Sequence, residues 1–152
     1  MPSGTELLTA TEPPLVILDT NVLVSAVVSP DERSPAKRVV RAVRSESFRL
    51  VLSEELMAEF DEVLRRNRLV RSHGLTDGQI DDLLAGLRRK AEFCEPRTPR
   101  TPPPDPRDMH VWSLHEAVPE AVLVTGDRAL IVGARADRRV MSPREFVDAY
   151  GL

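Results

Sequence analysis

The chain has 152 residues, a length that fits one domain and leaves little room for a second. Hydrophobic residues make up 41% and charged residues 30%, which is the composition of a globular protein and excludes a disordered chain. The formal net charge of −3 argues against a protein that holds nucleic acid through a broad basic surface. It leaves room for a nuclease whose site is acidic and whose basic residues are local.

The sequence also bears on location. Cys94 is the single cysteine and cannot form an internal disulfide, which fits a reducing cytoplasm. No segment reaches the apolar length of a membrane span, and residues 1–14 lack both the basic start and the apolar core of a signal peptide. We therefore expect a cytoplasmic protein without membrane attachment, in which residues 1–14 form a flexible tail and residues 15–152 one folded domain.

The first half of this domain alternates short apolar runs with helical patterns. Leu15–Leu18 is continuously apolar, as in a strand buried on both faces, and a helix could follow over Val22–Val28. Pro35–Arg44 has apolar residues at helical spacing, and Phe48–Leu52 is a second strand candidate. A helix capped by a serine is predicted for residues 53–66, and a broken helical stretch follows it.

The second half repeats the alternation after a helix with a capping box at residues 76–79 that runs to Lys90. Residues 91–95 form a weak strand candidate. Six prolines in residues 96–107 forbid a helix or central strand and predict a stiff surface loop. A helix over 108–117, strands over 121–124 and 139–141, and a final helix that begins at Ser142-Pro143 complete the pattern. Strands that alternate with helices predict an α/β fold, a three-layer α/β/α sandwich with a central parallel sheet.

Two aspartates follow predicted buried strands. Asp19 comes directly after Leu15–Leu18, and Asp127 follows the 121–124 strand after Thr125 and Gly126. Ligands of parallel α/β sheets bind beyond the carboxyl ends of the strands, so two such acids on adjacent strands would face one another. Taken singly, each could equally be a helix N-cap or turn residue.

Glu59 and Asp108 are further candidates. Glu59 lies at one edge of the apolar stripe of its helix and Asp61 at the other, so periodicity alone does not choose between them, and a solvated flank stays open. Asp108 opens the 108–117 helix, where an N-cap role is the alternative, and Asp105 stands nearby between prolines.

Four clustered carboxylates predict a divalent cation, because like charges at short range raise one another's pKa and a cation removes that cost. Mg²⁺ and Mn²⁺ prefer such oxygen ligands. Zinc is not expected, since His110 and His115 are on different faces of their helix and Cys94 has no thiol partner. Glycine-rich phosphate loops and serine-nucleophile motifs are absent from the sequence.

The same segments resemble the four motifs of PIN-domain nucleases, in order. The first is Leu15-Val16-Ile17-Leu18-Asp19-Thr20-Asn21, and the second, Ser53 to Glu59 followed by Val63-Leu64, selects Glu59 over Asp61. The third and fourth are Asp105-Pro106-Arg107-Asp108 with Val111, and Val124-Thr125-Gly126-Asp127-Arg128 with Leu130. Two features depart from the family pattern, the dense prolines before Asp105 and Pro119-Glu120-Ala121, where an aspartate is common.

The resemblance implies that Asp19, Glu59, Asp108 and Asp127 are the catalytic, metal-binding carboxylates. Asn21 and Thr125 would hold Asp19 and Asp127 by hydrogen bonds. The most similar subgroup contains toxins of toxin–antitoxin pairs. It implies an Mg²⁺- or Mn²⁺-dependent ribonuclease with an RNA substrate, a small antitoxin partner and a homodimeric assembly.

Two other functions remain open. One is a non-catalytic interaction module with a PIN-like fold in an RNA-handling or toxin–antitoxin assembly. The other is a phosphatase with Asp19 as nucleophile, which is disfavoured because that chemistry needs a second acid where this chain has Asn21.

Three groups of residues have two possible roles each. The basic clusters 65–71 and 88–90 could neutralise RNA phosphates or could be solvated helix ends. Trp112 could stack on a base or pack in the core.

Overall fold

The computed structural model describes residues 12–134 and 138–152, which form a five-stranded, all-parallel sheet in the order β3-β2-β1-β4-β5. The strands are β1 (Leu15–Leu18), β2 (Arg49–Leu52), β3 (Glu92–Phe93), β4 (Val122–Val124) and β5 (Val140–Met141). The helices are α2 (Thr20–Val28), α3 (Pro35–Arg44), α4 (Glu54–Leu64), α5 (Asn67–His73), α6 (Asp77–Lys90), the 3₁₀ turn η1 (Pro106–Asp108), α7 (Met109–Ala117), α8 (Arg128–Gly133) and α9 (Pro143–Tyr150).

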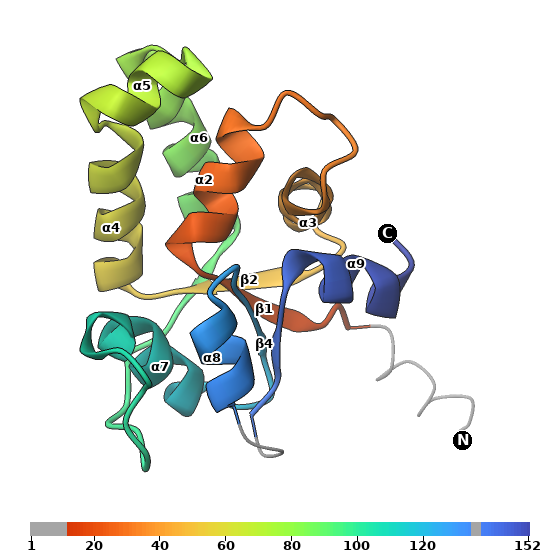
Figure 1. Ribbon diagram of the computed structural model, residues 1–152, viewed down its shortest axis with the longest axis vertical. Coiled ribbons are helices and arrows are strands. Elements are labelled where there is room, and N and C mark those ends of the chain that lie inside the picture. Colours follow the sequence, from red (N-terminus) through yellow and green to blue (C-terminus); the bar gives the residue numbers. More distant parts are fainter. Residues whose placement is uncertain (1–11, 135–137) are drawn as a thin grey trace.

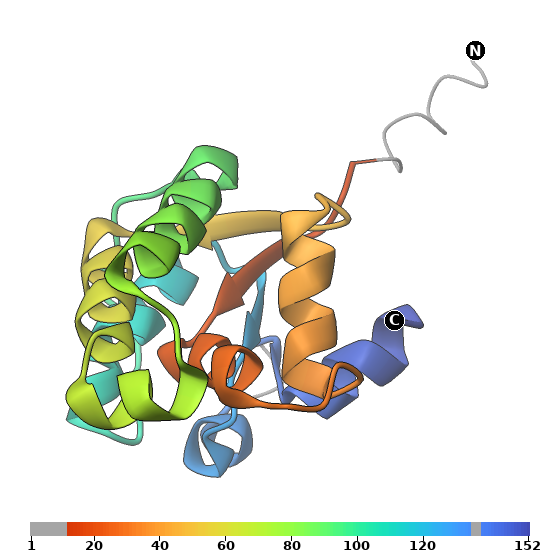
Figure 2. The ribbon, with the colours of Figure 1, turned by 90° about the horizontal axis from the view of Figure 1, so that it is seen from above.

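Helices cover both faces of the sheet, which confirms the predicted three-layer α/β/α sandwich. In Figure 1 the helices from α2 to α6 lie above the strands, and α7 and α8 lie below them. Seen from above, α2 lies between α3 on one side and α5 on the other (Figure 2). No helix in the described part of the chain is long and apolar enough to cross a membrane.

Side-chain caps set the helix starts, as the sequence predicts. Ser53 Oγ accepts from the Leu56 amide at 3.1 Å, and both Thr76 with Gln79 and Ser142 with Glu145 form complete capping boxes. The three inner strands, β2, β1 and β4, bury nearly all of their side chains, and Val16, Ile17 and Leu18 are 0% exposed. The core is therefore the interface between the sheet and its two helical layers.

Several boundaries differ from those predicted. The helix expected over 53–66 ends at Leu64 and is followed by a separate helix, α5. The helix expected from residue 108 is preceded by a 3₁₀ turn, η1, whose start is capped by Asp105 accepting from the Arg107 amide, and α7 itself begins at Met109. Helix α8 was not predicted: it has six residues, too few for a periodic pattern, and Asp127 starts it by accepting from the Ala129 amide at 2.9 Å.

Arg49 ties the residues before β1 to the sheet. Its guanidinium donates to the Pro13 carbonyl at 2.9 Å and pairs with Glu12 at 3.3 Å, and its amide donates to the Pro14 carbonyl at 2.8 Å. Residues 12–14, assigned to the tail by the sequence, thus lie against β2. The remainder of the predicted tail, residues 1–11, falls outside the described residues.

The proline-rich segment is an irregular loop packed onto α7. The Arg97 amide donates to the Ser113 carbonyl at 2.9 Å, and the Trp112 indole donates to the Thr101 carbonyl at 3.0 Å. Trp112 is 2% exposed, so the base-stacking interpretation is wrong and core packing holds. Neither segment flanking the loop stands apart as a domain of its own.

Two arginines of the basic clusters form ion pairs with acidic side chains. Arg65 binds Asp61, Asp77 and Asp81, which fastens α4 to α6, and Arg88 binds Glu54 at 3.0 Å. These two arginines thus join helices to one another.

Candidate metal site at the carboxyl edge of the sheet

The strand order creates a switch point between β1 and β4. From β1 the chain proceeds to β2 and β3 on one side, and then returns to β4 and β5 on the other. The connections that leave β1 and β4 therefore diverge, and the space between their carboxyl ends is where ligands bind in open parallel sheets. Asp19 and Asp127 follow these two strands, and the Asp19 amide donates to the Val124 carbonyl at 2.9 Å.

Asp19 is held at both carboxylate oxygens. Its Oδ1 accepts from the Thr20 amide at 2.8 Å, and its Oδ2 accepts from the Thr125 hydroxyl at 2.8 Å and from the Asn21 amide group at 3.2 Å. The side chain is buried, and this burial raises its pKa above the usual value although the hydrogen bonds from Thr125 and Thr20 act in the opposite direction. The negative charge of Glu59 raises the pKa further.

Asn21 and Thr125 connect the ends of the two strands. Thr125 donates to Asp19 and accepts from the Asp127 amide at 3.0 Å, so it holds the backbone of Asp127 rather than the carboxylate expected from the sequence. Asn21 Oδ1 accepts from the Gly126 amide at 2.8 Å. A Cβ atom at position 126 would lie 3.3 Å from that Oδ1, so glycine is what permits this close approach.

Asp108 differs from Asp19 and Asp127 in its capping role. Asp19 and Asp127 each accept from an amide at the start of a helix, whereas Asp108 caps α7 by backbone position only and makes no side-chain cap hydrogen bond. Its pKa is raised to about 6, first by burial, then by the negative charges of Asp19, Asp127 and Asp105, and also by a side-chain hydrogen bond with Asp127. A carboxylate that does not cap its helix and lies close to other acids is an available ligand.

Glu59 lies on the α4 side of this cluster and faces His110 at the start of α7. The His110 Nε2 to Glu59 Oε1 distance is 2.5 Å; this ion pair raises the pKa of His110 and lowers that of Glu59. Asp61, the other acid that the sequence left open on this helix, instead binds Arg65 and is 53% exposed. The geometry thus puts Glu59 toward the acids and Asp61 away from them.

One buried polar atom next to the cluster, His110 Nδ1, has no hydrogen-bond partner among the described residues. Glu59 Oε1 is paired with His110, and the pKa of Glu59 is lowered first by the hydrogen bond with His110 and also by one with Thr20. Buried polar groups in native proteins nearly always have partners, so an unpaired nitrogen beside an acidic site marks a position where a water or a ligand can bind.

The donor set suits a hard divalent cation. Carboxylate oxygens are the ligands that Mg²⁺ and Mn²⁺ prefer, and after burial the negative charges of neighbouring acids add to the raised pKa values of Asp19 and Asp108. In the described part of the chain no three acidic, histidine or cysteine side chains yet converge tightly enough to enclose an ion. One reason that these side chains do not enclose an ion is that the Glu59 carboxylate is paired with His110.

Sequence reasoning missed three participants. His110 entered only as a possible zinc ligand, because no periodicity shows that the start of α7 packs against α4. Thr20 was not singled out. Arg107 is bound by Asp105 at 2.8 Å, a contact within one turn that the Asp-Pro-Arg spacing could have indicated. His115, by contrast, is buried and bound to the Ala121 carbonyl at 2.8 Å, so it belongs to the core.

Comparison with known proteins gives one family match. The family model described as the PIN domain matches residues 15–129, which is most of the chain and includes all four acids. No curated protein matches the chain.

Proposed function

Because the chain belongs to the PIN-domain family, whose members are generally nucleases, we propose that it is a metal-dependent endoribonuclease that hydrolyses RNA phosphodiester bonds. The observation that carries the proposal is the acidic cluster at the switch point of the sheet. The pKa of Asp108 is raised to about 6 by burial and by the neighbouring aspartates, and its side chain makes no hydrogen bond that caps α7.

Each acidic residue has a definite role in this proposal. Asp19, Glu59, Asp108 and Asp127 would hold one or two Mg²⁺ or Mn²⁺ ions. A bound ion of this kind lowers the pKa of a coordinated water and offsets negative charge on the phosphate. Thr125 and Asn21 fix the orientation of Asp19 through their hydrogen bonds, so that its carboxylate needs little reorganisation when it binds.

Arg107 has the properties of a substrate-positioning group. Its guanidinium is 90% exposed and held by Asp105, and the charges of Asp108 and Asp127 act on it. A guanidinium fixed beside a metal site can bind a phosphate oxygen of the RNA backbone.

The test is to compare Asp19→Asn and Asp127→Asn with Asp148→Asn, an exposed acid of α9, a helix that packs on α3 and β5. Cleavage of a labelled single-stranded RNA with Mg²⁺ should fall about 100-fold or more in the first two variants, as expected when a group that stabilises the transition state is removed. It should be unchanged in the third. Undiminished cleavage by Asp19→Asn would refute the catalytic assignment. A DNA oligonucleotide of the same sequence tests the preference for RNA, and equal cleavage of both would refute that part.

One observation favours the alternative of a non-catalytic interaction module. Glu59 is bound to His110, and the described acids do not form a closed metal site. Calorimetric titration with Mg²⁺ and Mn²⁺ separates the two functions: binding that is lost in Asp19→Asn supports the nuclease, and no binding by the wild-type protein supports the module.

The biological setting follows from the same proposal. We expect a cytoplasmic toxin restrained by a small antitoxin protein, and a homodimer in solution. Expression of the chain alone should arrest growth and Asp19→Asn should not, whereas a neighbouring short gene should relieve the arrest when expressed together with it. Analytical ultracentrifugation measures the oligomeric state, and a monomer at micromolar concentration would contradict the dimer.

A further inference from the structure

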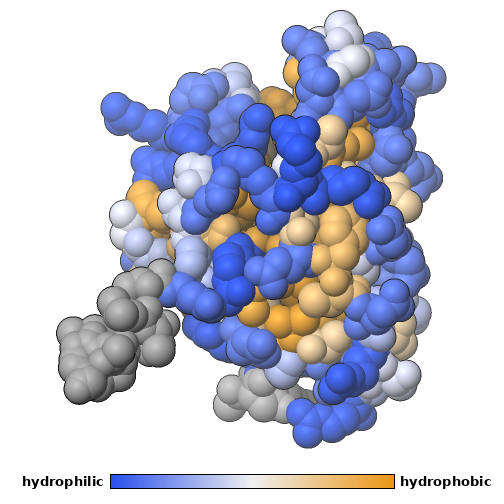
Figure 3. Space-filling model, turned by 180° about the vertical axis from the view of Figure 1, so that it is seen from behind, coloured by the Kyte–Doolittle hydropathy of each residue, from blue (hydrophilic) through white to orange (hydrophobic). Residues whose placement is uncertain are grey.

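A groove lies between α3 and α6. Its volume is about 770 Å³, and α2 also lines it. Figure 3 shows this side of the molecule, where apolar surface lies in a hollow between hydrophilic side chains. None of the four candidate metal-binding acids lines the groove, so binding here and cleavage can be measured separately.

The floor and the rim of the groove have different chemistry. Six aliphatic residues form the apolar part: Leu23, Ala26, Val27, Val40, Leu75 and Leu83. Four cations stand around them, Lys37, Arg41, Arg44 and Lys90, against two acids, Glu32 and Asp82. The lining is therefore net positive, although the chain as a whole has a net charge of −3. The charge of the groove lining is thus opposite in sign to the net charge of the chain.

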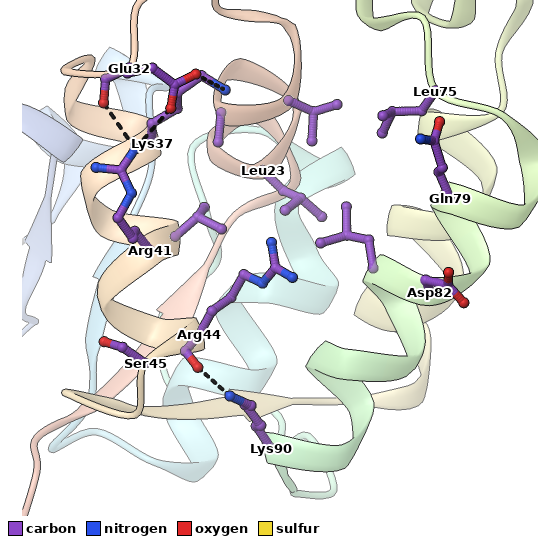
Figure 4. Close-up of a pocket in the computed structure, with 14 residues that line it drawn as sticks. Leu23, Glu32, Lys37, Arg41, Arg44, Ser45, Leu75, Gln79, Asp82 and Lys90 are labelled. Atoms are coloured by element: carbon purple, nitrogen blue, oxygen red, sulfur yellow. Dashed lines mark hydrogen bonds and ion pairs between the residues drawn. The ribbon is translucent and has the colours of Figure 1, made fainter.

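The rim cations are only partly neutralised. Glu32 binds Arg41 at 3.2 Å and lies 3.9 Å from Lys37, while Lys90 is 3.6 Å from Glu46. The Arg44 side chain makes no ion pair or hydrogen bond with any residue that the structure describes, and it extends into the groove in Figure 4. An exposed guanidinium above an apolar floor is suited to a ligand that presents a carboxylate next to apolar side chains.

We propose that this groove binds an acidic amphipathic helix of a partner protein. An amphipathic helix places apolar anchors at i, i+3, i+4 and i+7 in such a groove, which accounts for the aliphatic floor between two helices. Acidic residues on its flanks would meet the cationic rim, and the negative charge of the remaining surface would disfavour other docking positions. Nucleic acid fits less well, because single strands bind on aromatic platforms and none of the lining residues is aromatic.

The experiment selects binders without assuming their sequence. A displayed library of helical peptides of about 18 residues, or five turns, is selected on the full-length protein. Enriched peptides are synthesised, and their binding is measured by fluorescence anisotropy at low and high salt. We expect leucine or isoleucine at helical spacing with glutamate or aspartate on the flanks, and weaker binding at high salt.

Matched variants locate the binding. Arg44→Glu should weaken peptide binding about tenfold or more, as charge reversal within an interface does. Val27→Asp should weaken it to a similar extent, because it places a charge in the apolar floor of the groove. Arg33→Glu makes the same charge change outside the groove and should leave affinity within about twofold. Circular dichroism confirms that each variant is folded.

Several results would overturn the proposal. These are the absence of enriched peptides, enrichment of basic peptides, and binding that Arg44→Glu leaves intact. Binding of a single-stranded RNA oligomer that is lost in Arg44→Glu would also overturn it, because the groove would then be a nucleic-acid surface. RNA cleavage is measured in parallel, and its loss or retention does not bear on the peptide result.

Discussion

Asp108 illustrates how a single buried acid can lower the stability of the folded state. Its pKa of about 6 lies above the value of an unfolded aspartate, so the folded state binds the proton more tightly than the unfolded state does. In the absence of metal, the folded protein therefore loses stability as the pH rises through the interval between the two values. Above pH 6 the full penalty of a charged Asp108 remains.

Asp108→Asn removes this penalty. Without metal at pH 7.5, we expect the variant to melt a few degrees above the wild type, and the two melting temperatures should converge as the pH falls toward 4. Calorimetric melting curves in EDTA from pH 4 to pH 8 provide the measurement. A difference in melting temperature that is independent of pH would show that ionisation of the Asp108 carboxyl group does not cause it.

Thr125 tests whether the orientation of Asp19 matters for metal binding. Thr125→Val keeps the shape of the side chain but removes the hydroxyl that donates to Asp19 and accepts from the Asp127 amide. Affinity for Mn²⁺ should fall roughly 10–100-fold, the usual effect of losing a group that orients a ligand. Thr125→Ser retains the hydroxyl and should stay near the wild-type affinity. A folded Thr125→Val protein that binds Mn²⁺ normally would contradict this role.

At the residue scale, the sequence predicts those acids whose place follows from local structure. Asp19 and Asp127 could be located because they terminate buried strands, whose apolar runs are visible in the sequence. Glu59 could not be separated from Asp61 by periodicity, since the two border opposite edges of one stripe. Its contact with His110 depends on the packing of α4 against α7, which no local pattern encodes.

At the element scale, helices with capping boxes were predictable and short elements were not. The capping boxes at Thr76 and Ser142 fix the starts of α6 and α9, because their hydrogen bonds are made within three residues. Helix α8 has the cap from Asp127 but no capping box, and its six residues are too few for a periodic pattern. Gly133, its last residue, lies against Pro104 of the proline-rich loop.

That contact predicts opposite effects for two glycine substitutions. A Cβ atom at Gly133 would lie 2.6 Å from Pro104 Cγ, and the rigid proline ring cannot yield easily. Gly133→Ala should therefore destabilise the protein by about 1–3 kcal/mol, in the range of overpacking substitutions. Gly86 lies within α6 with no atom closer than 3.9 Å to the added methyl, so Gly86→Ala should stabilise by about 0.5–1 kcal/mol. Urea unfolding measures both, and a neutral Gly133→Ala would mean that the loop is free to move away from α8.

At the scale of the whole molecule, the sequence predicts the layers but not the strand order. Alternating strands and helices require a parallel sheet covered on both faces, and right-handed connections place the helices. Nothing in the sequence says that the chain turns back after β3 and adds β4 beside β1. That reversal creates the switch point, so the site owes its position to long-range packing even though its aspartates are visible locally.

The whole molecule should also report metal binding through its stability. A ligand that binds only the folded state adds about 2.7 kcal/mol at a concentration 100 times its dissociation constant, so saturating Mn²⁺ should raise the melting temperature clearly at pH 7.5. The increase should be smaller at pH 5.5, because protons then compete for Asp108, whose pKa is raised to about 6 by burial and by the neighbouring acids. Asp19→Asn should abolish most of the effect, and Asp148→Asn should preserve it. If Mn²⁺ raises the melting temperature of Asp19→Asn as much as that of the wild type, the ion binds elsewhere and the acids at the switch point do not form the metal site.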